Sequence, residues 1–281
     1  MEKPFLAALA EGVLLADGAM GTEIYSRGIP MDRCYGELNL SAPELIGAIH
    51  ASYIQAGAQV IETNTFGANP ASLAAHGLET KAREINLRGA EIARKASGGL
   101  AYVAGSVGPA ACAGLSEPRR FAAYASQIEA LRDGGVALLI LETFSHLQEA
   151  GIAYRAARAV SRLPVVVQFS FHNPELTPGE ATKAAGEWGA DAVGTNCNSP
   201  EETLEYMERA TRVGSIRLSA MPCAGLPVIN QGRAFYPTSP RDMAAWARRL
   251  VQAGISLIGG CCGTTPAMIK EMGSSLRPLN L

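Results

Sequence analysis

Short apolar runs alternate with longer amphipathic segments along the whole chain, and this alternation limits the possible folds more than any other feature. Eight runs have the apolar continuity typical of strands that are covered on both faces, as in a parallel sheet. They are residues 13–16, 59–62, 101–104, 138–141, 165–168, 192–194, 218–221 and 256–258. The sequence therefore predicts an α/β protein with eight parallel strands.

Helical patterns with recognisable first turns fill the segments between these runs. Ser41, Ser199, Ser239 and Thr265 each precede a proline by one or two positions, an arrangement that favours the start of a helix. Eight strand–helix units in 281 residues average about 35 residues each, which matches a single (β/α)8 TIM barrel. A doubly wound open sheet is the alternative, but no Gly-x-Gly-x-x-Gly turn follows the first run. We expect one domain over residues 1–281.

Composition and charge exclude several classes of protein. The net charge is -2, and the basic residues are dispersed rather than clustered, so we expect no nucleic-acid partner. No run approaches the roughly 18 apolar residues that cross a bilayer, and no basic leader with a cleavage pattern is present, so we expect no membrane association. The sequence favours a cytoplasmic protein, in which reduced cysteines commonly bind metal or act as nucleophiles.

Four of the six cysteines follow predicted strands, and three of them form a candidate metal site. Cys261 and Cys262 lie just beyond the run at 256–258, and Cys197 lies just beyond the run at 192–194. In a barrel the carboxyl ends of these strands meet at one mouth, so the three thiolates predict a zinc site with an open fourth position. Gly259, Gly260 and Gly263 supply the backbone freedom that adjacent ligands need.

The paired cysteines also allow roles without a bound zinc ion. A strained vicinal disulfide would leave Cys197 unexplained, and an iron–sulfur cluster normally needs a fourth cysteine at short spacing. The pair could also result from packing alone. Cys34 and Cys112 are expected to be small apolar side chains. The four histidines (His50, His76, His146 and His172) show no ligand spacing and are expected to be surface or packing residues.

An all-sulfur zinc site favours thiol chemistry. The thiolate is the nucleophilic form of a thiol, and zinc stabilises it at neutral pH. Asp17 and Glu142 follow predicted strands and could hold a substrate ammonium, although a helix cap or loop hydrogen bond is the alternative. The backbone N–H groups of Gly18 and Ala19 could bind a carboxylate, with a plain tight turn as the alternative. Together these residues suggest an amino acid with a terminal thiol.

Five segments carry a family resemblance: residues 17–22 (DGAMGT), 62–66 (ETNTF), 142–144 (ETF), 196–197 (NC) and 259–264 (GGCCGT). They resemble the homocysteine S-methyltransferase family, with the strongest likeness to the homocysteine-binding module of cobalamin-dependent methionine synthase. The resemblance covers about residues 12–272. It implies a zinc-bearing barrel in which Cys197, Cys261 and Cys262 bind Zn²⁺. It also implies that Asp17, Gly18, Ala19 and Glu142 contact homocysteine, with Glu62 and Asn64 nearby.

One position departs from the methionine synthase pattern. Residues 223–227 read Cys-Ala-Gly-Leu-Pro where that pattern has Asn-Ala-Gly-Leu-Pro. Cys223 is therefore expected to be either a displaceable fourth ligand or a bystander. A fourth thiolate would produce the arrangement that is typical of closed, structural zinc sites.

The resemblance implies methyl transfer to homocysteine, a step of methionine biosynthesis. The chain has no Asp-x-His-x-x-Gly motif of a corrinoid-binding domain and no second barrel for folate. Unless the chain is a fragment of a longer protein, the donor is therefore expected to be a small molecule such as S-methylmethionine, or a methyltetrahydrofolate-linked methylcorrinoid presented by a separate protein. Two alternatives remain: a non-catalytic, zinc-stabilised barrel that binds homocysteine within a larger methyltransferase system, and a different barrel enzyme whose cysteines are structural.

Overall fold

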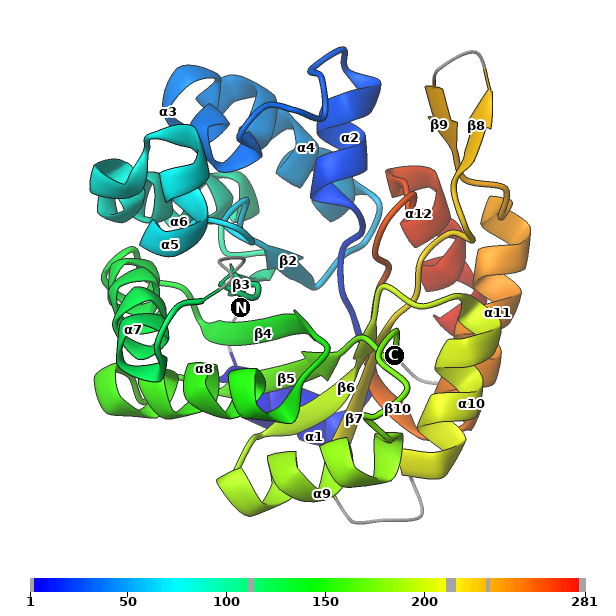
Figure 1. Cartoon of the computed structure of the whole chain (residues 1–281). Coiled ribbons are helices and arrows are strands. Elements are labelled where there is room, and N and C mark those ends of the chain that lie inside the picture. Colours follow the sequence, from blue (N-terminus) through cyan, green and yellow to red (C-terminus); the bar gives the residue numbers. More distant parts are fainter. Residues whose placement is uncertain (1–2, 111–113, 211–215, 231–232, 278–281) are drawn as a thin grey trace.

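Eight parallel strands form a sheet that closes into a barrel, and helices surround it (Figure 1). The computed structural model describes residues 3–110, 114–210, 216–230 and 233–277. The barrel strands are β1 (Leu14–Leu15), β2 (Val60–Glu62), β3 (Tyr102–Val107), β4 (Leu138–Phe144), β5 (Val165–Phe169), β6 (Ala192–Asn196), β7 (Arg217–Met221) and β10 (Ile255–Ile258). They follow one another around the barrel in chain order, as in a TIM barrel. All eight predicted strands and the predicted fold class are confirmed.

The barrel closes through a narrow pairing between β1 and β2. One bridge joins Ala16 to Val60 in parallel register. On either side of it, the Gln59 N–H donates to the Leu15 carbonyl at 2.7 Å and the Asp17 N–H donates to the Val60 carbonyl at 2.9 Å. Beyond that point the Asp17 carboxylate accepts the Glu62 N–H at 3.0 Å. A side chain thus continues the hydrogen bonding where the backbone ladder ends.

A long helix follows each barrel strand and covers its outer face. These helices are α4 (Pro43–Gln55), α6 (Ala82–Ser97), α7 (Glu117–Asp133), α8 (Leu147–Val160), α9 (Pro178–Trp188), α10 (Pro200–Ala210), α11 (Pro240–Gln252) and α12 (Pro266–Leu276). Shorter helices are α1 (Phe5–Glu11), α2 (Met20–Ser26), α3 (Leu38–Ser41) and α5 (Pro70–Leu73), and single 3-10 turns cover Tyr35–Glu37, Ala74–His76 and Glu79–Lys81. No helix of the described residues is long and apolar enough to cross a membrane.

All four predicted helix starts are confirmed, and α4 begins at Pro43. Ser199, Ser239 and Thr265 each accept a backbone N–H of the following first turn through the side-chain oxygen. The predicted capping role of Ser41 is wrong. Its hydroxyl donates to the Glu37 carboxylate at 2.9 Å, and Ala42 occupies the N-cap position of α4 without a side-chain bond.

Alternating side chains divide the apolar interior into two layers, as the two-residue period of a strand requires. On β4, Leu138 and Ile140 belong to a cluster inside the barrel, whereas Leu139 and Leu141 belong to the larger cluster between the sheet and the helices. The N-terminal helix α1 contributes Phe5 to the inner cluster, where its ring meets Tyr102 edge to face at 5.6 Å. The sequence analysis predicted no helix there.

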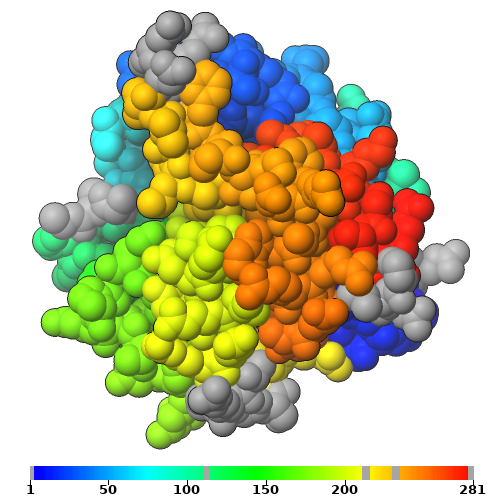
Figure 2. Space-filling view, turned by 90° about the vertical axis from the view of Figure 1, so that its right-hand side faces the viewer, coloured from blue at the N-terminus to red at the C-terminus, as the bar shows by residue number. Residues whose placement is uncertain are grey.

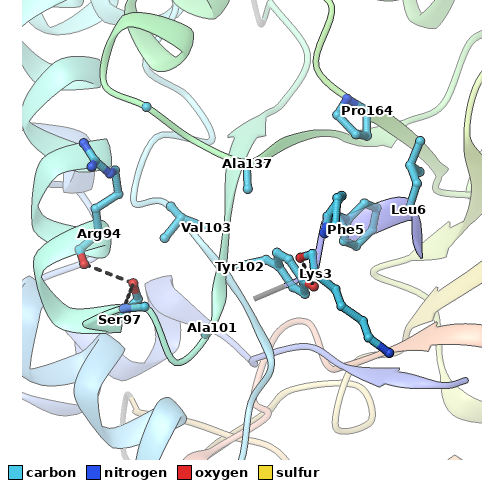
Figure 3. A pocket seen from close by; sticks show the side chains of 13 residues that line it. Lys3, Phe5, Leu6, Arg94, Ser97, Ala101, Tyr102, Val103, Ala137 and Pro164 are labelled. Atoms are coloured by element: carbon cyan, nitrogen blue, oxygen red, sulfur yellow. Dashed lines mark hydrogen bonds between the residues drawn. The ribbon is translucent and has the colours of Figure 1, made fainter. Parts of the chain in front are cut away.

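A cavity of about 530 Å³ lies beside α1 at the amino ends of β3, β4 and β5 (Figure 3). Ala101, Ala137 and Pro164, which line it, each come just before a barrel strand. Two polar side chains that line it already have partners: the Tyr102 hydroxyl donates to the Lys3 carbonyl, and the Ser97 hydroxyl donates to the Arg94 carbonyl. The cavity therefore lies at the end of the barrel opposite to the predicted site.

A two-stranded hairpin, which the sequence analysis did not predict, separates β7 from α11. It consists of the antiparallel strands β8 (Val228–Asn230) and β9 (Arg233–Phe235). Figure 2 shows it as the gold projection above α10, α11 and α12. Apolar side chains on and before the hairpin face solvent, with Leu226 at 76% and Ile229 at 69% exposure.

The packing of β6 against β7 predicts the effect of one added methyl group. A Cβ on Gly194 would stand 1.9 Å from the Ser219 carbonyl oxygen and 2.2 Å from its hydroxyl. We expect Gly194→Ala to lower the free energy of unfolding by at least about 1–3 kcal/mol, the usual cost of overpacking. Urea denaturation measures this change.

Gly186→Ala is the matched control, because Gly186 lies on α9 and its added Cβ would have no neighbour within 4 Å. Alanine at an exposed helical position should stabilise by up to about 1 kcal/mol. Equal unfolding free energies for the two variants would contradict the barrel packing described above.

Candidate metal centre

Four cysteine sulfurs lie together at the carboxyl ends of three neighbouring strands. Cys197 follows β6, Cys223 follows β7, and the pair Cys261 and Cys262 follows β10. Their Sγ atoms all lie within 4.8 Å of one another. The separations are 3.9 Å for Cys197–Cys262, 3.9 Å for Cys197–Cys223 and 4.0 Å for Cys261–Cys262. The structure thus brings the three predicted ligands together and adds Cys223 to them.

Backbone hydrogen bonds connect the segments that carry the four cysteines. The Cys223 N–H donates to the Asn198 carbonyl at 2.8 Å, next to Cys197. The Cys261 N–H donates to the Pro222 carbonyl at 2.8 Å, and the Ala224 N–H donates to the Cys262 carbonyl at 2.8 Å. Backbone hydrogen bonds thus join each cysteine-bearing segment to the next one and hold the cysteines close together.

Two left-handed backbone positions allow this convergence. Cys197 has φ 61°, which is uncommon for a residue with a side chain, and Gly263 has φ 79°. A Cβ on Gly263 would come within 2.1 Å of the Tyr236 ring. The turn after Cys262 therefore requires glycine both for its conformation and for the close approach of Tyr236.

Three of the sulfur–sulfur separations fit a tetrahedral metal site closely. Metal–sulfur bonds of 2.3 Å at tetrahedral angles place sulfurs about 3.8 Å apart, close to the values of 3.9–4.0 Å observed here. A disulfide would require about 2.0 Å, and the described cysteines are all free thiols. A vicinal disulfide between Cys261 and Cys262 is therefore excluded in this structure.

Hydrogen bonds within the cluster shift the pKa of three of its thiols in different directions. Hydrogen bonds from Cys197, Cys223 and Cys261 lower the pKa of Cys262 strongly. Hydrogen bonds with Cys197, Cys223 and Cys262, together with burial, raise the pKa of Cys261, and the hydrogen bond with Cys197 is the largest cause of the raised pKa of Cys223. A divalent cation would favour the thiolate form of all four cysteines.

The remaining cysteines and histidines lie outside this cluster. Cys34 packs against a small buried cluster that includes Leu73 and Ile85, in agreement with the prediction of an apolar role. Cys112 falls outside the described residues. His50 is fully buried in α4, and burial lowers its pKa to about 4, so it is a neutral packing residue at physiological pH.

Three carboxyl groups lie close to one another at the same mouth of the barrel. They belong to Asp17 after β1, Glu62 at the end of β2 and Glu142 on β4. Burial raises the pKa of each, and mutual repulsion with Glu142 raises the pKa of Asp17 and Glu62 further. Among the described residues, no lysine or arginine forms an ion pair with any of the three. The pocket therefore favours a cationic ligand.

The Glu142 carboxylate is held from both sides. The Ser106 hydroxyl on β3 donates to Oε1 at 2.5 Å, and the Asn196 amide on β6 donates to Oε2 at 3.0 Å. The carboxyl group also lies near the sulfurs, since the Cys262 thiolate contributes to its raised pKa. Glu142 thus occupies the boundary between the carboxyl pocket and the sulfur cluster.

The segment at Gly18 and Ala19 lies against the loop that follows the paired cysteines. The Ala19 N–H donates to the Thr264 carbonyl at 3.0 Å, and a Cβ on Gly18 would come within 2.6 Å of the same oxygen. Gly18 is therefore required for close packing. The Ala19 N–H is already engaged, so its binding of a substrate carboxylate stays a prediction that needs this bond to exchange.

Asn64, which was predicted to lie near the substrate, forms hydrogen bonds that connect β2 to the surrounding helices. Its amide donates to the Tyr35 carbonyl at 2.7 Å and to the Asn39 side chain at 3.1 Å. Asn39 in turn donates to the Asn64 and Ile85 carbonyls. These bonds tie the end of β2 to α3 and α6, and a role of Asn64 in substrate binding stays a prediction.

Tyr236 is a residue of the site that the sequence analysis did not identify. It follows the hairpin, and its ring packs on Gly263 beside the paired cysteines. Burial and then the thiolates of the cluster raise its pKa, so the phenol is neutral at physiological pH. No periodicity or motif marks this position, because its neighbours come from another part of the chain.

A sequence profile of homocysteine S-methyltransferase matches residues 14–276. The chain belongs to the homocysteine S-methyltransferase family. It is 33% identical to the methionine synthases of Mycobacterium leprae and Mycobacterium tuberculosis, over 98% and 96% of this chain. It spans only about a quarter of the length of these relatives, 25% in both cases.

Solved structures of the family show the same barrel. The metallated form of the homocysteine methyltransferase MmuM from Escherichia coli aligns with a TM-score of 0.83 at 28% identity, covering 96% of this chain and 99% of that chain. Its oxidized form aligns with a TM-score of 0.82 at 29% identity, covering 96% and 98%. A family member thus takes up metal on this fold, in agreement with the four-cysteine site.

The sulfur cluster predicts metal content directly. We expect one metal ion per chain in protein purified under reducing conditions, and loss of most of it in Cys261→Ala, because the remaining donors leave the tetrahedron incomplete. Elemental analysis by mass spectrometry measures this ratio. Cys34→Ala is the control and should retain the metal, since Cys34 lies in a separate apolar cluster. Equal metal content in both variants would show that the cluster does not bind the ion.

Proposed function

We propose that this protein transfers a methyl group to the sulfur of homocysteine and produces methionine, with zinc as the metal of the four-cysteine site. One observation carries the proposal. A cluster of sulfur donors lies beside a buried carboxyl pocket that has no lysine or arginine partner among the described residues. An amino acid with a terminal thiol satisfies both regions at once.

The donor set supports zinc. Four cysteine sulfurs within 4.8 Å of one another, as here, suit the tetrahedral zinc sites of proteins. Zinc in this position would keep the homocysteine sulfur in its nucleophilic thiolate form near neutral pH. Three ligands, Cys197, Cys261 and Cys262, are also those that the family resemblance implies.

Cys223 is the ligand that we propose homocysteine replaces. A tetrahedral ion has four positions, which the four cysteines of this chain would fill. An incoming sulfur would then take the place of one cysteine. Cys223 stands where the methionine synthase pattern has asparagine, and its segment continues into the hairpin rather than into a helix on the barrel.

The rest of the pocket orients the substrate. Asp17 and Glu142 would hold the α-ammonium group, and Glu62 adds a third carboxyl group to the same pocket. The backbone at Gly18 and Ala19 would face the α-carboxylate. Fixing both polar groups of the amino acid directs its sulfur to the cysteine cluster, which lowers the entropic part of the barrier.

Methyl transfer then needs a donor above the sulfur. The sulfur lone pair forms the new carbon–sulfur bond while the bond between the methyl carbon and its leaving group breaks, and the leaving group keeps that electron pair. Two donor classes fit this step: a methylcorrinoid linked to methyltetrahydrofolate and carried by a separate protein, or a small onium compound such as S-methylmethionine. We propose that the reaction takes place in the cytoplasm.

A second candidate function follows from the length of the relatives. Because the chain spans a quarter of the methionine synthases it matches, it could serve as the homocysteine-binding subunit of a larger system, with no turnover of its own. Homocysteine binding without methionine formation from any donor distinguishes this function from the first.

A donor panel tests the proposed function. Metal-loaded protein and homocysteine are incubated with methylcobalamin, methyltetrahydrofolate or S-methylmethionine, and methionine is measured by mass spectrometry. We expect one donor class to support turnover, and Cys261→Ala to abolish it because the sulfur is then no longer activated. Full turnover in metal-depleted Cys261→Ala would refute the mechanism.

Cys223→Asn tests the displaceable ligand. Removing a thiolate that competes with the substrate should raise the affinity for homocysteine about tenfold or more, equivalent to about 1.4 kcal/mol, while the metal stays bound. Isothermal titration calorimetry measures the affinity. Unchanged affinity would show that Cys223 does not compete with homocysteine.

A further inference from the structure

We propose that Asn196 is a positioning residue that fixes the ammonium-binding carboxylate of Glu142 relative to the sulfur cluster, and thereby selects thiols that carry an α-amino group. The inference rests on the proposed binding of homocysteine. Asn196 lies in one of the motifs that carry the family resemblance, but neither that motif nor the metal geometry had given it a role.

The Asn196 side chain forms hydrogen bonds with two residues of one strand, β4. It is the last residue of β6, is 1% exposed and immediately precedes Cys197. Its amide donates to Glu142 Oε2 at 3.0 Å and to Thr143 Oγ1 at 2.8 Å, and its carbonyl oxygen accepts the Thr143 N–H at 2.9 Å. Since β5 separates β4 from β6 in the sheet, these bonds span the mouth of the barrel above β5.

Asn196 also connects the two unusual backbone positions of the chain. Among the described residues, only Thr143 with φ 64° and Cys197 with φ 61° are non-glycine residues with positive φ. Such conformations are costly for side-chain-bearing residues and persist where the surrounding structure holds them. Asn196 is bonded covalently to Cys197 and binds Thr143 through both its N–H and its hydroxyl. One side-chain amide thus binds the strained Thr143 directly and belongs to the residue next to the strained Cys197.

The consequence for the substrate is geometric. In homocysteine, two methylene groups separate the sulfur from the carbon that carries the ammonium. A site that binds both ends must keep Glu142 and the Cys197 sulfur at a matching separation. Ser106 fixes one oxygen of Glu142 and Asn196 fixes the other, and only Asn196 also continues directly into a cysteine of the cluster.

The test compares two thiols that differ by one group. Homocysteine and 4-mercaptobutanoate share the thiol, the chain length and the carboxylate, but 4-mercaptobutanoate lacks the amino group. Metal-loaded protein is titrated with each by calorimetry, and the ratio of the two affinities measures recognition of the ammonium. Wild-type protein should prefer homocysteine.

Asn196→Asp removes both amide donors and places a carboxylate against Glu142. We expect it to reduce the preference for homocysteine about 10- to 100-fold, the range for a lost hydrogen bond to a charged group. Affinity for 4-mercaptobutanoate and metal content should stay unchanged. Asn196→Ser, which is smaller and neutral, should show the same direction and serves if the aspartate variant does not fold. In a Glu142→Gln background the effect should shrink, because the group that is positioned has lost its charge.

Asn86→Asp is the matched control. Asn86 is also a fully buried asparagine whose amide donates twice, to the Ala68 and Ala82 carbonyls, but it lies on α6 away from the cluster. It should leave the preference unchanged. A wild-type protein that binds both thiols equally would overturn the proposed function itself. A wild-type preference that Asn196→Asp and Asn196→Ser retain, or an equal loss for both thiols, would overturn only the role of Asn196.

Discussion

Closure of the parallel barrel is the constraint on which the site depends. Because all eight strands run in one direction around a closed sheet, the segments after β6, β7 and β10 leave the barrel at the same end. Four sulfurs from these segments come within 4.8 Å of one another. Hydrogen bonds between the segments then hold them, and the left-handed turns at Cys197 and Gly263 direct the side chains inward.

Two clusters of acidic side chains share this end of the barrel, and each favours a different positively charged ligand. The sulfur cluster suits a dication that binds thiolates, whereas the carboxyl pocket suits an ammonium group. Glu142 belongs to the carboxyl pocket and is also affected by the sulfur cluster, because the Cys262 thiolate contributes to its raised pKa. Ligands that supply positive charge to either region relieve this repulsion, so metal and substrate stabilise the folded protein by mass action as well as completing its chemistry.

The sequence predicted the features that depend on local pattern or on strand direction. The eight apolar runs identify the strands because strands covered on both faces need continuous apolar residues. The convergence of Cys197 with Cys261 and Cys262 follows from the barrel and was therefore also predictable. The cap at Ser41 was wrong because Glu37, one turn earlier, accepts its hydroxyl.

Features that depend on distant contacts could not be predicted. The β8–β9 hairpin has three residues in each strand and solvent-exposed apolar side chains, so it has neither the length nor the alternation of a typical strand. Asn196 stands next to a recognisable cysteine, but its partners Glu142 and Thr143 lie at sequence separations of 54 and 53.

The Asp17 carboxylate belongs to two systems at once. It accepts the Glu62 amide where the pairing of β1 with β2 ends, and it forms one wall of the carboxyl pocket. A substrate ammonium that binds this oxygen therefore competes with the Glu62 N–H, whose hydrogen bond is the last one between β1 and β2. Ligand binding in the carboxyl pocket and the strength of the β1–β2 pairing are therefore coupled through one oxygen atom. The exchange rate of the Glu62 amide hydrogen with solvent reports on both.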